Sequence, residues 1–72
     1  MRVLVKIGDA ARVTGYLEGS ELKLSDVETA APLAREVSFR HQAGGEWRTV
    51  AVKGSRVETG IPNDWIVLEL DL

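Results

Sequence analysis

Apolar and polar residues alternate along most of this chain, which is the pattern of β-strands with one buried face. Segment 1–7 places apolar residues at its odd positions and carries Arg2 and Lys6 on the other face. Segment 12–18 alternates in the same way. In segment 65–72, the even positions predict an apolar inner face that ends at Leu72, with Glu69 and Asp71 outside. The pattern therefore predicts strands at both ends of the chain.

Three glycine-led dipeptides predict two-residue turns, because glycine accepts the positive φ that tight hairpins require. They are Gly19-Ser20, Gly44-Gly45 and Gly54-Ser55. The first turn would place Leu17 opposite Leu22 and Gly15 opposite Leu24. It would also place Glu18 opposite Glu21, an unfavourable pair of like charges. The third turn would place Val52 opposite Val57.

The Gly44-Gly45 turn predicts a hairpin with one apolar face and one polar face. A slip of one residue would exchange the two faces. The predicted pairs are His41 with Arg48, Phe39 with Val50, Val37 with Val52 and, on the outer face, Glu36 with Lys53.

One segment departs from the strand pattern. Ser25 and Glu28 match a capping box, and Pro32 would interrupt a longer helix,. We therefore expect a short irregular or one-turn helical crossover near 28–35. Six to seven short strands in 72 residues then predict a single all-β domain over 1–72. The expected fold is a strongly bent antiparallel sheet or small barrel of the SH3-like or OB-like kind, bent at Gly15 and closed by its first and last strands.

Composition narrows the chemistry. The chain is 44% hydrophobic and 28% charged, with a net charge of −2, no cysteine and one histidine. These values predict a folded protein without disulfides, metal or cofactor. The polar residues within 1–7 also speak against a membrane span, and the lack of cysteine predicts a cytoplasmic location.

No catalytic motif stands out, so we do not expect an enzyme. His41 is the only imidazole, and no serine lies in a nucleophile motif,. A solvated residue at a hairpin tip is the simpler interpretation of His41. No helix or Walker lysine follows Gly44-Gly45, so the two glycines indicate a turn rather than a phosphate site.

The leading hypothesis is a non-enzymatic binding or assembly module that contacts protein, foremost a second copy of itself. Its candidate interface consists of Leu4, Trp65 and Val67, apolar residues on the presumed outer faces of the terminal strands,. The alternative is that the 28–35 crossover covers these strands.

The second hypothesis is a binder of single-stranded nucleic acid or oligosaccharide on the outer face of the 36–53 hairpin. Its candidate residues are Arg40, Trp47, Arg48 and Lys53, because an aromatic ring beside cations suits stacked, charged ligands,. The negative net charge counts against nucleic acid.

Overall fold

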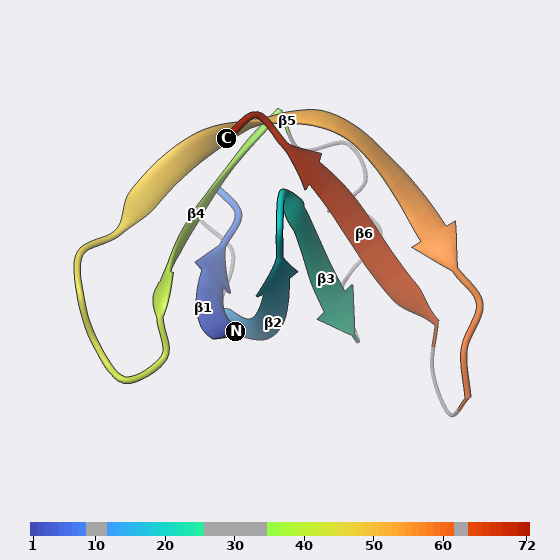
Figure 1. The fold of residues 1–72 in the computed structure, drawn as a ribbon, viewed down its shortest axis with the longest axis horizontal. Coiled ribbons are helices and arrows are strands. Elements are labelled where there is room, and N and C mark those ends of the chain that lie inside the picture. Colours follow the sequence, from blue (N-terminus) through green and yellow to red (C-terminus); the bar gives the residue numbers. More distant parts are fainter. Residues whose placement is uncertain (9–11, 26–34, 62–63) are drawn as a thin grey trace.

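Six antiparallel strands form the whole regular structure of the described chain. The computed structural model describes residues 1–8, 12–25, 35–61 and 64–72, and no helix occurs there. The predicted crossover near 28–35 lies outside the described residues except for its last position. The strands are β1 (Arg2–Lys6), β2 (Val13–Glu18), β3 (Glu21–Ser25), β4 (Glu36–His41), β5 (Arg48–Glu58) and β6 (Trp65–Leu70) (Figure 1). The prediction of a small all-β fold is confirmed.

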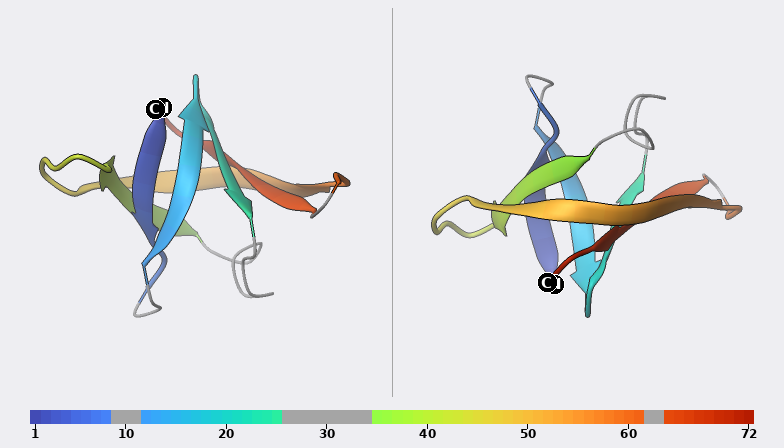
Figure 2. Two further views of the ribbon diagram at one scale, coloured as in Figure 1. Left: turned by 90° about the horizontal axis from the view of Figure 1, so that it is seen from below. Right: turned by 90° about the horizontal axis from the view of Figure 1, so that it is seen from above.

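The strands close into a barrel in the order β1-β2-β3-β6-β5-β4. Long β5 forms an arch over the barrel (Figure 1), and the two views of Figure 2 show it crossing the other strands. The barrel is closed by β4 pairing with β1 and by β6 pairing with β3. The expected pairing of the first and last strands is therefore wrong: β1 lies between β2 and β4, and β6 lies between β3 and β5.

Apolar side chains from five strands fill the interior, and Val13 and Leu17 of β2 pack against them. Burying them removes apolar surface from water, which is the main favourable contribution to folding. Val3 and Val5 are buried and Ile7 packs against the core, as predicted for the first strand. Met1 and Leu72 were also predicted to face inward, but they lie beyond the ends of β1 and β6 and are exposed. The core consists of Val3, Val5, Leu22, Leu24, Val37, Phe39, Val50, Leu68 and Leu70.

The β2–β3 hairpin has the predicted register. Leu17 pairs with Leu22, Gly15 with Leu24, and Glu18 with Glu21. Gly19 in the turn has a φ of 58°, a left-handed value that glycine adopts without a steric penalty,.

The β4–β5 hairpin keeps the predicted faces but not the predicted register. Phe39 pairs with Arg48, and Val37 pairs with Val50, so the strands are shifted by two residues. The connection spans 42–47 rather than two glycines, and the His41 imidazole stabilises it by accepting a 3.1 Å hydrogen bond from the Ala43 amide. A shift of two preserves the side-chain faces. The alternating pattern therefore could not distinguish the two registers.

The predicted turn at Gly54-Ser55 is wrong, because β5 runs through both residues. Residues 48–51 of β5 pair with β4, and its later residues pair with β6. A register irregularity between Val52 and Gly54 lies at this change of partner. The glycine therefore belongs to a bulge or bend, which is the other common use of glycine in a strand.

Candidate functional site

Trp47 is placed between two arginines on the outside of the barrel. The Arg12 guanidinium carbon lies 5.3 Å from the centre of the Trp47 ring, and that of Arg40 lies 5.4 Å from it. Arg40 belongs to β4 and Arg12 directly precedes β2, with β1 between these strands. The ring therefore lies on the outer side of the β2-β1-β4 part of the barrel. It remains 37% exposed, so a ligand can reach it.

The outer face of β1 adds two cations on the same side of the barrel as this ring. Arg2 and Lys6 alternate with the inward Val3 and Val5. In the described part of the chain, neither these two residues nor the arginines at Trp47 form an ion pair with a carboxylate. We call Arg2, Lys6, Arg12, Arg40 and Trp47 the Trp47 face. None of its four cations has an ion-pair partner in the described chain, although the net charge of the whole chain is −2.

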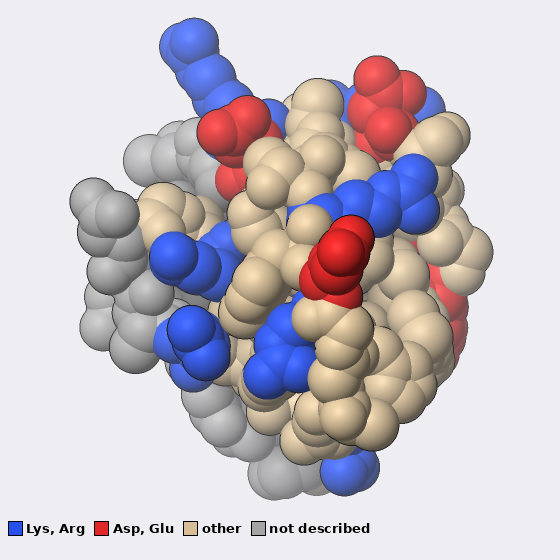
Figure 3. Space-filling view, turned by 90° about the vertical axis from the view of Figure 1, so that its left-hand side faces the viewer, with Lys and Arg blue, Asp and Glu red and all other residues tan. Residues whose placement is uncertain are grey.

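Figure 3 looks onto the side of the barrel that carries β4 and the 42–47 connection. Lys and Arg side chains spread across this view, with one acidic group projecting among them and others near the upper edge. Basic side chains are thus prominent on this side of a molecule whose net charge is −2. A net charge alone conceals such a local field.

Two of the four predicted ligand residues come together in the structure. Arg40 and Trp47 are in contact, as described above. Arg48 pairs with the inward-facing Phe39, so it lies on the opposite face of the sheet from Arg40. Lys53 is six positions from Trp47 along an extended chain, roughly 20 Å away. Neither Arg48 nor Lys53 joins the aromatic contact.

Sequence reasoning missed Arg2, Lys6 and Arg12 as members of this face. A signal for Arg2 and Lys6 was present, since alternation already placed them on the outer side of the first strand. The missing information was the neighbourhood of that strand. Only the pairing of β1 with both β2 and β4 places these cations on the same side of the barrel as Trp47.

The residues predicted as a protein interface do not form one patch. Leu4 lies on β1, between Thr14 and Arg40, whereas Trp65 and Val67 lie on β6. Two strands separate β1 from β6 in either direction around the barrel. Val67 is fully buried. These three residues therefore do not build a continuous apolar surface. Self-association stays a prediction.

The outer side of β6 carries a network of ion pairs instead. Arg56 of β5 contacts Glu21 of β3 at 2.9 Å, so its side chain reaches across β6. It also contacts Glu58 at 3.3 Å and Glu69 at 3.4 Å. The hydrogen bond to Glu21 is the largest cause that raises the pKa of Arg56 above its ordinary value. Val67 lies between Lys23 and Arg56 in the sheet, beneath this network.

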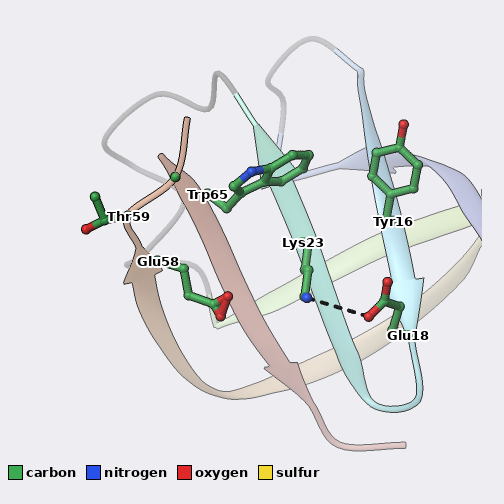
Figure 4. A pocket seen from close by; sticks show the side chains of 7 residues that line it. Tyr16, Glu18, Lys23, Glu58, Thr59 and Trp65 are labelled. Carbon is green, nitrogen blue, oxygen red and sulfur yellow. Dashed lines mark ion pairs between the residues drawn. The ribbon is translucent and has the colours of Figure 1, made fainter. Parts of the chain in front are cut away.

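A pocket of about 400 Å³ lies beside the network. Its aromatic wall is made by Tyr16 and Trp65, whose ring centres are 6.0 Å apart at an interplanar angle of 65°. Figure 4 shows Trp65 extending from β6 over β3 toward Tyr16. The polar lining comprises Glu18, Lys23, Glu58 and the 59–60 segment.

The described residues offer no metal site, since nowhere among them do three or more His, Cys, Asp or Glu gather as ligands. His41 is exposed, and its imidazole is engaged with the Ala43 amide in the connection. No helix in the described ranges is long and apolar enough to span a bilayer.

Comparison of the chain with models of known protein families, with curated proteins and with solved structures finds no match.

Proposed function

We propose that this protein is a non-enzymatic binding module that holds single-stranded nucleic acid on the Trp47 face. The observation that carries the proposal is an exposed indole between two guanidinium groups that have no carboxylate partner in the described chain. A base can stack on the indole by displacing one guanidinium group from the ring, and the displaced cation can then bind a neighbouring phosphate,. The closed barrel supplies a rigid support for these groups.

The surrounding charge favours nucleic acid over a neutral oligosaccharide. A sugar can stack on Trp47 but gains little from four nearby cations without acidic partners. A polyanion releases counterions when it meets those cations, and this release gives a favourable contribution that weakens as salt rises. An unstacked base is also far more accessible in a single strand than in a duplex.

The test is the affinity for a labelled single strand of about twelve nucleotides, measured by fluorescence anisotropy over a series of salt concentrations. We expect Trp47→Ala to lower the affinity by about 1–3 kcal/mol, because one stacked base is lost. Arg40→Ala should also reduce the slope of log K against log salt by about 0.7, the value for one phosphate contact on a single strand.

Lys53→Ala is the matched control for Arg40→Ala. It removes one cation from the neighbouring strand, far from the indole. We expect it to leave the contribution of the Trp47 stack to the affinity unchanged. The proposal is wrong if the wild-type protein does not bind the strand at low salt. It is also wrong if Trp47→Ala binds as tightly as the wild type.

A further inference from the structure

The pocket beneath Tyr16 and Trp65 lies next to the Trp47 face and differs from it in charge. Its acidic residue Glu18 is paired with Lys23 of the same pocket at 3.5 Å. Its second acidic residue, Glu58, is paired with Arg56 at 3.3 Å. The pocket thus offers hydrogen-bond donors and acceptors with little uncompensated charge. Such a lining suits a neutral polar group better than a free phosphate or an isolated cation.

The aromatic wall restricts the shape of that group. Tyr16 and Trp65 meet edge to face, so they form a corner with apolar surfaces on two sides,. A volume of about 400 Å³ is within the range of small-molecule sites,. In Figure 4, the Lys23 ammonium lies between Glu18 and Glu58, so donor and acceptor atoms stand side by side below the rings. A flat ring with donors and acceptors along one edge fits this arrangement.

Arg2 connects the pocket to the Trp47 face. Its guanidinium carbon lies 5.6 Å from the centre of the Tyr16 ring, and it donates a 3.3 Å hydrogen bond to the Tyr16 hydroxyl. On its other side, the Arg2 carbonyl accepts a hydrogen bond from the Gln42 amide, at the start of the connection that carries Trp47. Arg2 belongs to β1, which lies between β2 with Tyr16 and β4, whose Arg40 contacts Trp47. Its guanidinium can therefore bind a phosphate of a strand that passes across β1 from one aromatic position to the other.

From these contacts we infer that the Tyr16/Trp65 pocket is a second nucleobase site for the same single strand. The inference rests on the proposed function and extends it: one base stacks at Trp47, the backbone passes Arg2, and a later base enters the pocket. The paired carboxylates keep phosphates out of the pocket and accept hydrogen bonds from ring or exocyclic N–H groups of the base.

The experiment uses the Trp47→Phe protein, in which Trp65 is the only tryptophan and the stacking ring at 47 is retained. We expect a single strand of about twelve nucleotides to bind this protein and to quench its Trp65 fluorescence. Tyr16→Ala should lower the affinity for that strand by about 5- to 150-fold, the range for one lost stack. Leu72→Ala, which shortens an exposed apolar residue outside the pocket, serves as the control for affinity.

Each outcome separates the two proposals. The second site is overturned if Trp47→Ala weakens binding while Trp65 is not quenched and Tyr16→Ala has no effect. That result leaves the proposal for the Trp47 face in place. Quenching by neutral oligosaccharides but not by nucleic acid overturns it in favour of a sugar site. Absence of any nucleic-acid binding removes both proposals. Far-ultraviolet circular dichroism tests whether Tyr16→Ala is folded, and the quenching measurement does not depend on that variant.

Discussion

Gly15 on β2 faces the interior of the barrel, where it is opposite Val3 on one side and Leu24 on the other. A Cβ atom at this position would lie 2.6 Å from Leu24 Cδ2, 3.0 Å from Val5 Cγ2 and 3.1 Å from the backbone oxygen of Lys23. The two side chains could move only at the expense of their own packing, and the backbone oxygen is fixed in the β2–β3 ladder. The absent side chain thus lets neighbouring strands approach closely.

We expect Gly15→Ala to destabilise the protein by about 1–3 kcal/mol, the usual effect of adding a methyl group to a packed core. The measurement is urea unfolding followed by circular dichroism, with a lower midpoint and an unchanged slope. Gly54→Ala is the control, because a Cβ there meets its nearest atom at 3.6 Å, an ordinary contact. Equal midpoints for the two variants would show that β2 can move away from Leu24 without penalty.

Glu18 and Glu21 show how a residue-level expectation can be right and still incomplete. The turn does place them opposite each other. Their repulsion is offset by separate partners: Lys23 for Glu18 at 3.5 Å and Arg56 for Glu21 at 2.9 Å. Arg56 comes from a strand that is distant in sequence, so local pattern reasoning had no means of finding it.

At the level of elements, the sequence predicted strand faces better than strand partners. Val37, Phe39 and Val50 lie inside as the alternation requires. The register around 42–47 was wrong because a period of two leaves any shift of two residues undetermined. The turn at Gly54-Ser55 was wrong because glycine serves bulges as well as turns, and the local sequence does not distinguish these uses.

Arg56 connects three strands and provides a prediction about their association. Its contacts to Glu21 and Glu69 join β5 to β3 and β6. We expect Arg56→Met to lower the urea midpoint at low salt and to differ less from the wild type at about 1 M salt, where exposed charges are screened. Lys53→Met on the same strand, whose residue has no ion pair in the described chain, is the control. Equal, salt-independent effects of both substitutions would contradict the role of the network.

The contribution of Arg56 to stability depends on pH with a definite sign. The folded protein raises the pKa of Arg56 above its ordinary value. A cation with a raised pKa contributes its stability fully below the ordinary pKa and loses it only as pH rises through the folded pKa. Titration of Arg56 itself therefore leaves its contribution constant through the neutral and mildly alkaline range. A change of the Arg56→Met effect there would have to come from another group.

At the scale of the whole molecule, closure of the barrel decides which residues become neighbours. Sequence alternation placed Arg2 and Lys6 outside, but only the β1–β4 pairing places them next to the strand whose Arg40 contacts Trp47. The same closure separates Leu4 from Trp65, although both were expected on outer faces. The candidate site could therefore be predicted only in part, as Arg40 with Trp47. Strand order depends on long-range pairing, which a local pattern does not encode.

That closure also predicts how the protein folds. Two pairings complete the barrel, and they join residues far apart in the chain: Val3 with His41, and Glu21 with Glu69. Such non-local contacts require long loops to close before they stabilise the structure, so we expect refolding in milliseconds to seconds rather than microseconds.

Stopped-flow fluorescence of the Trp47→Phe protein tests this expected refolding time, because Trp65 on β6 reaches Tyr16 on β2 only when β2, β3 and β6 are assembled. If closure is the rate-limiting event, Trp65 fluorescence and far-ultraviolet circular dichroism should change with one common rate. If the circular dichroism signal of the strands instead forms well before the Trp65 signal, the hairpins are stable before the barrel closes. The long-range pairings would then not be what holds this small fold together.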